Sequence, residues 1–351
     1  MPRALPLLAL SCLVPLLSGA APPESRPRWQ YTVTVSDAAR GVLDIDWTYS
    51  GRVTRLCVDM RGGEAGLVGE VTAVGVGALA RKGACFAVPG GGRTGLRLRY
   101  RYGLSQMAGR RGDPDLASQS GRSFIANDQA FVLRPDPPPP QADIEARFLL
   151  PEGFAVAAVW EALPPLGGDP GREARFRYDA AQYDAGAYVA LGPLRSLGAI
   201  ALPGGTARVT LLTGNGAAAA DDGSLKGWVA SALGTAARFY GALPGGTAHV
   251  ILAPVPGVDD AGVFGTILRR ERPSAVLFFG AGARGPDFVG NWMGVHELFH
   301  IGNPPMRRRA QWFVEGVTTY YQDVLRARNQ SRSEIDMWGD LYDGFRRFCD
   351  P

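Results

Sequence analysis

The sequence predicts an α+β protein with two domains, and two patterns along the chain support this. Residues 28–200 hold short runs in which apolar and polar residues alternate with a period of two, the pattern of half-buried strands. Residues 205–351 mix such runs with longer segments whose apolar residues recur at helical spacing. We therefore expect an N-terminal β-sandwich-like domain followed by a mixed α+β domain. The 47 glycines and 27 prolines among 351 residues would supply the turns of a β-rich half.

The first 20 residues are expected to be a secretory signal. Arg3 is a minimal charged start, an apolar run follows, and Ser18-Gly19-Ala20 has the small side chains of a cleavage site. The run is short and broken by proline, so we expect no stable membrane span after signal removal. Cys12 raises the alternative of a lipid anchor, against which the preceding Ala9-Leu10-Ser11 argues. The mature chain is therefore expected to be periplasmic or secreted.

The β domain is expected to consist of strands separated by glycine-rich turns. They cover residues 29–35, 43–49, 53–58, 96–102 and several stretches from 144 to 192. Residues 104–122 are polar and glycine-rich, which predicts a long loop or a disordered segment. The proline run over residues 134–140 predicts a stiff spacer between strand groups. Cys57 and Cys85 lie in strand-like runs and could form a disulfide in an oxidising compartment.

The second domain is expected to begin with a strand over residues 207–212 and a helix over residues 222–240. Strands around residues 249–253 and 275–279 follow, and two further helices come after them. His249 lies in the middle of a strand, where a core or surface histidine is the ordinary interpretation and a metal ligand the alternative.

His296-Glu297-Leu298-Phe299-His300 is the strongest chemical signal in the chain. Positions four apart return to nearly the same face of a helix, so His296 and His300 could share one Zn²⁺ ion. Glu297 lies beside that face and would act on a water molecule instead of binding the metal. The chain has 3 histidines and two of them occupy this motif, which argues against a chance pair.

A catalytic zinc site of this kind needs a third protein ligand and one open position. A third histidine six residues after His300 is excluded, because Met306 stands there. The helix predicted over residues 312–321 instead carries Glu315 among aromatic residues, where an unpaired carboxylate would be costly unless a cation met it. We therefore expect one zinc ion held by His296, His300 and Glu315.

These motifs resemble those of the glycyl aminopeptidase family of gluzincin zinc metallopeptidases. The matching segments are His-Glu-x-x-His-x-x-Asn from His296 to Asn303 and Trp-Phe-x-Glu-Gly-x-Thr-x-Tyr-Tyr from Trp312 to Tyr321. Stretches upstream, at residues 144–154, 176–192 and 237–254, are similar to the β domain of the family and to the start of its catalytic domain. The resemblance implies a thermolysin-like catalytic domain, zinc at His296, His300 and Glu315, and Glu297 as the general base.

The sequence also departs from the family pattern. The family commonly carries a Gly-x-x-Glu-His segment on an edge strand, where the Glu captures the free amino terminus of a substrate. Leu268 and Arg269 stand at those positions here, although a shift in register would bring in Glu271. Amino-terminal trimming is therefore left open. Only 36 residues follow Glu315, which implies a C-terminal helical domain that is short or missing.

Residues that could assist the chemistry are less well specified. The family supplies a Tyr or His donor for the oxyanion of the transition state. Tyr320, Tyr321 and Tyr342 are the candidates here, with packing as the alternative for each. Thr319 lies one turn after Glu315 and could hydrogen-bond a ligand imidazole, or lie on the helix surface.

Composition narrows the class of function without naming a substrate. The chain is 46% hydrophobic and 20% charged with a net charge of +4, which are globular values and no sign of nucleic-acid binding. Arg307-Arg308-Arg309 could meet a substrate carboxylate or form a solvated turn. The leading hypothesis is an exported zinc metallopeptidase acting on peptide or protein substrates, with aminopeptidase action as one form. The alternative is a non-catalytic zinc-containing binding or scaffold protein.

Overall fold

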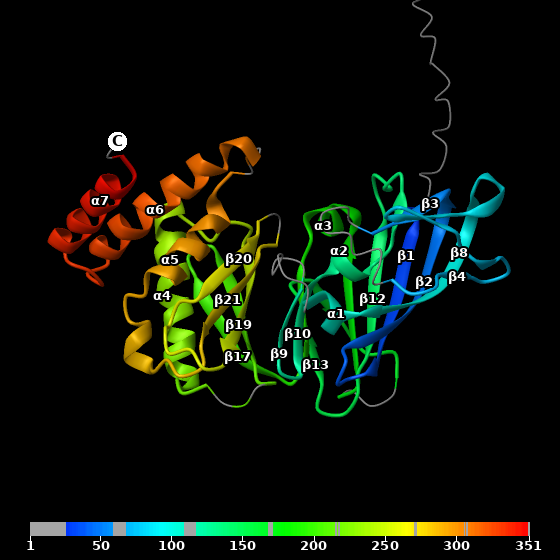
Figure 1. Ribbon diagram of the computed structural model, residues 1–351, viewed down its shortest axis with the longest axis horizontal. Coiled ribbons are helices and arrows are strands. Elements are labelled where there is room, and N and C mark those ends of the chain that lie inside the picture. Colours follow the sequence, from blue (N-terminus) through cyan, green and yellow to red (C-terminus); the bar gives the residue numbers. More distant parts are fainter. Residues whose placement is uncertain are drawn as a thin grey trace, which may run out of the picture.

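The computed structural model describes residues 26–349 except 59–67, 109–116, 168–170, 215, 217, 270, 271, 305 and 307. The expected signal over residues 1–20, Glu271 and Arg307 lie outside the described residues. Figure 1 shows two bodies side by side, one built of sheets and one in which helices cover a sheet. In the described part of the chain, no helix is long and apolar enough to cross a membrane.

The largest sheet has eight strands. Their order is β14 (Glu161–Leu163), β15 (Glu173–Asp179), β12 (Asp143–Leu149), β1 (Arg28–Asp37), β2 (Val42–Val53), β8 (Arg93–Gly103), β4 (Thr72–Ala73) and β5 (Gly77–Ala78). Only β1 and β12 pair in parallel. Every second residue of β1 is buried, including Trp29 and Tyr31, and the residues between them face outward. The alternation predicted for these strands is confirmed.

Two four-stranded sheets complete the N-terminal body. One has the order β11 (Arg134–Asp136), β3 (Arg55–Cys57), β7 (Cys85–Ala87), β6 (Arg81–Lys82), and the other β13 (Ala155–Ala157), β16 (Tyr188–Gly192), β10 (Ser123–Asn127), β9 (Ala117–Ser120). The expected disulfide joins β3 to β7 through Cys57 and Cys85. Between strands lie α1 (Leu104–Ala108), α2 (Asp128–Phe131), α3 (Ala180–Ala185) and the 3₁₀ turn η2 (Pro89–Gly91).

Two segments of this body are more regular than the sequence predicts. The loop expected over residues 104–122 contains α1 at one end and β9 at the other, because β9 pairs with the buried strand β10. The proline run begins as β11, whose Pro135 pairs with Leu56. A proline is tolerated there because β11 is an edge strand and needs no hydrogen bond on its outer side.

The second body is built on a five-stranded sheet. Its order is β17 (Leu194–Leu202), β18 (Gly205–Leu212), β19 (Thr247–Val255), β21 (Ser274–Gly280), β20 (Phe264–Leu268). The three central strands are parallel and both edge strands are antiparallel to their neighbours. The expected domain boundary between residues 200 and 205 falls inside the β17–β18 hairpin, so β17 belongs to this second sheet.

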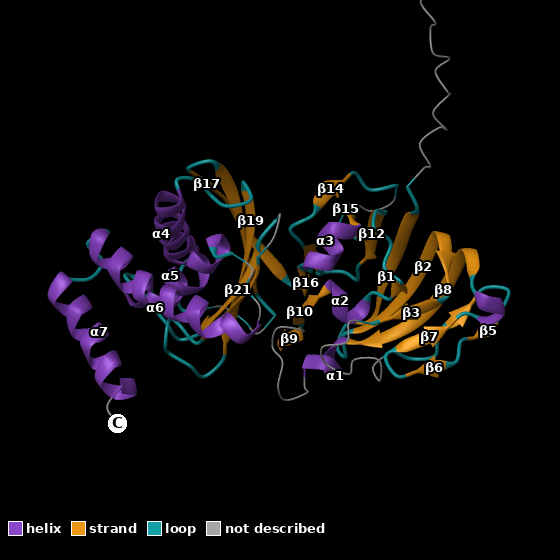
Figure 2. Ribbon diagram, turned by 90° about the horizontal axis from the view of Figure 1, so that it is seen from above, coloured by secondary structure: helices purple, strands orange, loops and turns teal. Residues whose placement is uncertain are grey.

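Helices cover one face of this sheet (Figures 1 and 2). Helices α4 (Asp222–Tyr240) and α5 (Trp292–Phe299) lie against the sheet, α6 (Gln311–Arg328) packs on α5, and α7 (Glu334–Cys349) packs on α6. The 3₁₀ turns are η3 (Gly285–Phe288), η4 (His300–Gly302) and η5 (Arg308–Ala310). The predicted helix over residues 222–240 is confirmed. Asp221 caps it by accepting a hydrogen bond from the Ser224 amide, and Gly241 ends it in a left-handed conformation.

The opposite face of the five-stranded sheet packs on the sheet of β13, β16, β10 and β9. Ile125 and Tyr188 from the N-terminal body meet Leu212, Ile251 and Val276 in one buried cluster. The Tyr188 hydroxyl also hydrogen-bonds the Thr266 hydroxyl at 2.8 Å. The sheet is therefore covered by helices on one face and by the β body on the other.

Candidate metal centre

Helix α5 presents the first motif from the edge of the helical layer. The Asn291 side chain caps it by accepting from the Met293 amide at 3.1 Å. Met293 and Leu298 are buried in the core, which fixes the rotation of the helix and turns His296 and Glu297 towards its half-buried side. Gly294 allows a close approach to α4, because a Cβ there would lie 2.5 Å from the Trp228 indole nitrogen.

The predicted donors from two helices meet at one point. His296 Nε2 lies 3.4 Å and His300 Nε2 lies 3.2 Å from the same oxygen, Oε2 of Glu315. One ligand atom from each residue lies within 4.8 Å of the others. The two imidazole rings are almost perpendicular, at 83°, with centroids 5.0 Å apart. The structure thus brings together the three residues predicted from the sequence.

Glu315 comes from the first turns of α6 and is held from its other oxygen. The Gln311 amide, one helical turn earlier, donates to Oε1 of Glu315 at 2.6 Å. This leaves Oε2 directed at the two imidazoles. The reversal between the helices is short, as the sequence suggested, because η4 and η5 take up most of the chain from His300 to Ala310.

Gln322 orients the first imidazole, and the sequence analysis did not single it out. His296 Nδ1 lies 2.7 Å from Gln322 Oε1, an atom that can only accept, so Nδ1 carries the proton and Nε2 keeps its lone pair for a metal. The Gln322 amide nitrogen donates to Asp323, which also accepts from Arg326 at 2.9 Å. Arg326 in turn donates to the Gly290 carbonyl. This chain of bonds ties the histidine to the loop before α5.

A hydroxyl and an amide support the second imidazole. Thr318 Oγ1 lies 3.3 Å from His300 Nδ1 and donates to the Val314 carbonyl, which leaves it able to accept the Nδ1 proton. The Asn303 amide nitrogen, which can only donate, lies 3.1 Å from the same nitrogen and donates to Thr318 Oγ1 at 2.7 Å. The prediction for Thr319 is corrected by one position, because Thr318 is fully buried and Thr319 is exposed. Burial lowers the pKa of His300 to about 4, so the ring is neutral at neutral pH, the form that binds a metal.

Glu297 lies against the edge strand β20. A Cβ on Gly265 would come within 2.2 Å of Glu297 Cγ, so only glycine leaves the carboxylate its present position. The side chain is half-buried between α5 and the strand. Glu297 follows His296 directly in the chain and is outside the cluster of three ligand atoms.

The three candidate oxyanion donors lie in different surroundings. Tyr321 stacks on Phe299 with centroids 5.6 Å apart and also contacts Phe239, as a packing aromatic does. Tyr320 is 43% exposed beside Tyr321. Tyr342 is 63% exposed on α7, where Arg346 lies over its ring. None of these contacts joins a tyrosine to the metal donors.

The donor set fits a zinc ion. Two neutral imidazole nitrogens and one carboxylate oxygen are the ligands of catalytic zinc sites, which keep a further position open. His296 has an acceptor on Nδ1, as histidine ligands of zinc usually have, and a hydroxyl that can accept lies 3.3 Å from Nδ1 of His300. Among the described residues, this is the one group of three or more His, Cys, Asp or Glu side chains whose ligand atoms converge in this way.

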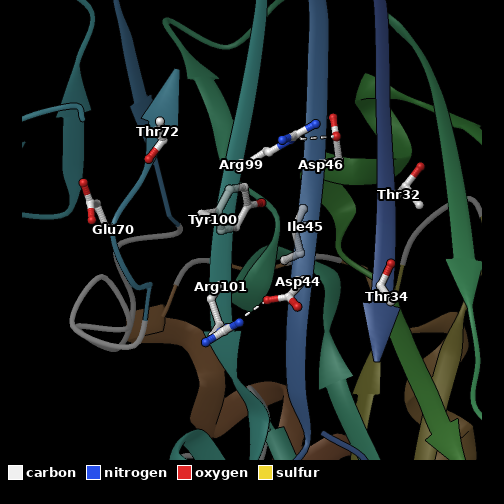
Figure 3. A pocket seen from close by; sticks show the side chains of 10 residues that line it. All are labelled: Thr32, Thr34, Asp44, Ile45, Asp46, Glu70, Thr72, Arg99, Tyr100 and Arg101. Carbon is white, nitrogen blue, oxygen red and sulfur yellow. Dashed lines mark hydrogen bonds and ion pairs between the residues drawn. The ribbon is translucent and has the colours of Figure 1, made fainter. Parts of the chain in front are cut away.

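A hollow lies on the outer face of the eight-stranded sheet, lined by residues between Thr32 and Arg101. Figure 3 shows its polar lining, in which Arg101 bonds Asp44 and Arg99 bonds Asp46 across neighbouring strands. These charges satisfy one another as cross-strand pairs on a solvated sheet face. The arrangement is that of a sheet surface and offers no convergent group for catalysis.

No family model and no curated protein sequence matches the chain. Solved structures do. The aminopeptidase N family protein of Idiomarina loihiensis superposes with a TM-score of 0.67 at 16% identity, over 88% of this chain and 56% of that chain. An M1 zinc metallopeptidase from Deinococcus radiodurans gives 0.54 at 18% identity, over 92% and 74%. Yeast LTA4 hydrolase in complex with bestatin gives 0.50 at 13% identity, over 94% and 55%.

The chain has the fold of these zinc peptidases. The gluzincin-like fold expected from the motifs is thereby confirmed, with the β domain first and the catalytic-type domain second. The chain spans about half the length of the Idiomarina protein and of the yeast hydrolase, at 56% and 55%. In the described part of the chain, α7 is the one helix that follows α6.

Proposed function

We propose that the protein is a zinc-dependent metallopeptidase that hydrolyses peptide bonds. The observation that carries this proposal is the convergence of His296, His300 and Glu315, with Glu297 next to His296 on α5. The M1 peptidase fold adds support, because those neighbours are zinc metallopeptidases. One zinc ion would be held by the two Nε2 atoms and by Oε2 of Glu315.

The residues of the chain divide the chemistry among them. When bound, zinc lowers the pKa of water and polarises a carbonyl group. Glu297 would take the proton of the attacking water and pass it to the amine that leaves. Gln322 and Thr318 would hold the imidazoles in the tautomer that leaves Nε2 unprotonated. Edge strand β20 borders the site and has an open side along which an extended peptide could pair.

We further propose that the protein acts after export to the periplasm or the exterior. The disulfide between Cys57 and Cys85 supports this, because such bonds persist in oxidising compartments. Aminopeptidase action is the finer form of the proposal. Leu268 at the end of the edge strand and Arg269 after it argue against this form, because an acidic residue would hold a substrate amine there.

Hydrolysis by the wild type and by Glu297→Gln separates this proposal from a zinc-containing scaffold. We expect the zinc-loaded wild type to cleave a mixed peptide pool and Glu297→Gln to be slower by roughly a hundredfold or more, with unchanged zinc content. Mass spectrometry of the products would show whether cuts lie at the amino terminus or within peptides. Equal rates in both proteins, or no cleavage in either, would favour the scaffold.

A further inference from the structure

A hollow of about 660 Å³ lies beside the metal centre, where α5 ends. Its size is within the range of pockets that hold small ligands, roughly 300–1,000 Å³. The side chains that shape it are Tyr240, Pro244, Pro273, Ile301, Pro304 and Arg269. Of the described residues that line it, Arg269 alone carries a charge, and the others are mostly apolar.

Arg269 lines this hollow and also lies near the carboxylates of Glu315 and Glu297. It follows the last residue of β20, the strand whose Gly265 touches Glu297. The carboxylates of Glu315 and Glu297 lie close enough for their charges to act on the guanidinium. Three residues, Thr266 to Leu268, separate Gly265 from Arg269, and these four steps of extended backbone span about 13 Å. An extended peptide paired along β20 would cover that span with about four residues, so the Arg269 backbone lies within about four substrate residues of the bond that Glu297 would help to break.

The charges of the site leave Arg269 able to bind a negatively charged ligand. Burial lowers the pKa of the guanidinium, yet an arginine stays charged at neutral pH. No hydrogen bond or salt bridge joins its guanidinium to another described residue. Counted over a divalent ion and the described residues Glu297, Glu315 and Arg269, the two carboxylates offset the ion, and Arg269 leaves one positive charge beside an apolar hollow. Such a site favours a group with an apolar body and a negative end.

We propose that this hollow is a substrate subsite in which Arg269 binds a carboxylate of the peptide. The inference rests on the proposed peptidase function and adds the substrate class, peptides with a carboxylate within about four residues of the cleaved bond. That carboxylate could be the C-terminus, an acidic side chain or an acidic group at the amino end. A planar guanidinium can hold any of them through two parallel hydrogen bonds.

Binding to an inactive form tests the subsite apart from catalysis. The full chain carrying Glu297→Gln is loaded with zinc and titrated calorimetrically with four peptides. The peptides are alike except for the acidic group that each one carries or lacks. They are a free C-terminal acid, its C-terminal amide, an amide with one glutamate side chain, and an amide with an N-terminal succinyl group. We expect at least one acidic form to bind about tenfold or more tightly than the plain amide.

Variants of Arg269 show whether this preference for acidic peptides depends on its guanidinium. Added to Glu297→Gln, Arg269→Gln should abolish the preference, Arg269→Lys should keep part of it, and Arg328→Ala on the exposed end of α6 should leave it unchanged. The peptide form that loses its advantage in Arg269→Gln identifies the source of the carboxylate. No preference for any acidic form, or a preference that survives Arg269→Gln, overturns the subsite.

The outcome is separable from that of the proposed function. If the wild type cleaves peptides without any acid preference, the peptidase proposal stands and the subsite is rejected. If an Arg269-dependent acid preference is measured while the wild type cleaves nothing, the subsite stands as a binding site and the peptidase proposal is rejected.

Discussion

At the scale of single residues, the candidate metal centre also depends on side chains that are not among its three ligand residues. Gln322 lies seven positions after Glu315, two helical turns along α6, so both side chains share one face. That spacing was readable in the sequence. What could not be read was the partner, because His296 is 26 positions away and the crossing of α5 and α6 decides which atoms meet. The same crossing selects Thr318 over Thr319, since both lie about one turn after Glu315.

Gln322→Ala should weaken zinc binding by about tenfold to a hundredfold, because the Nδ1 proton of His296 loses its acceptor. Gln322→Glu keeps an acceptor oxygen and should recover most of the affinity. Thr319→Ala, an exposed change on the same helix, is the matched control and should bind zinc like the wild type. Competition with a coloured zinc chelator measures all four proteins. Wild-type affinity in Gln322→Ala would show that the hydrogen bond does not orient the ligand.

At the scale of elements, the edge strand β20 and the motif helix α5 pack very closely. At Gly265 there is room for a hydrogen atom but not for a Cβ. An added Cβ at Gly265 would lie 2.2 Å from Glu297 Cγ and 2.6 Å from its Cδ. The sequence placed Glu297 on a helix, and the family resemblance placed Leu268 and Arg269 on an edge strand. Both elements are present, but the strand runs from Phe264 to Leu268 and Arg269 follows it. Their contact arises from tertiary packing, so no local pattern could reveal it.

Gly265→Ala should lower peptide hydrolysis by about tenfold or more, because the carboxylate must move away from the position of a general base. Gly316→Ala on α6 is the control, since a Cβ there meets nothing within 4 Å. In that exposed helical position alanine should stabilise the protein by roughly 0.5–1 kcal/mol. Steady-state hydrolysis and urea unfolding are measured on both variants. A Gly265→Ala protein as active as the wild type would contradict the proposed crowding.

At the scale of the whole molecule, the central sheet carries a buried titratable group close to the β body. His249 in β19 is buried, and its Nε2 lies 2.9 Å from the Thr210 hydroxyl. Its Nδ1 has no hydrogen-bond partner among the described residues. The nearby Arg208 donates to the Ala158 carbonyl of the β body at 2.7 Å. The sequence favoured a core or surface histidine at position 249, and its burial shows that it is a core histidine. A periodic pattern could not decide between the two, because it does not tell which strand is central.

Acid should therefore destabilise the whole fold through His249. Burial, and then the charge of Arg208, lower its pKa to about 3, whereas the unfolded chain titrates near 6.5. Below pH 6.5 the unfolded state takes up a proton that the folded state refuses, so this contribution to stability is complete at higher pH and is lost as the pH falls towards 3. Between pH 7 and pH 5 the loss should be about 2 kcal/mol. His249→Gln lacks the titrating ring, so its urea-unfolding free energy should fall by that much less over the same interval. Because all other ionisable groups are common to the two proteins, an equal fall in both would mean that His249 is protonated in the folded state.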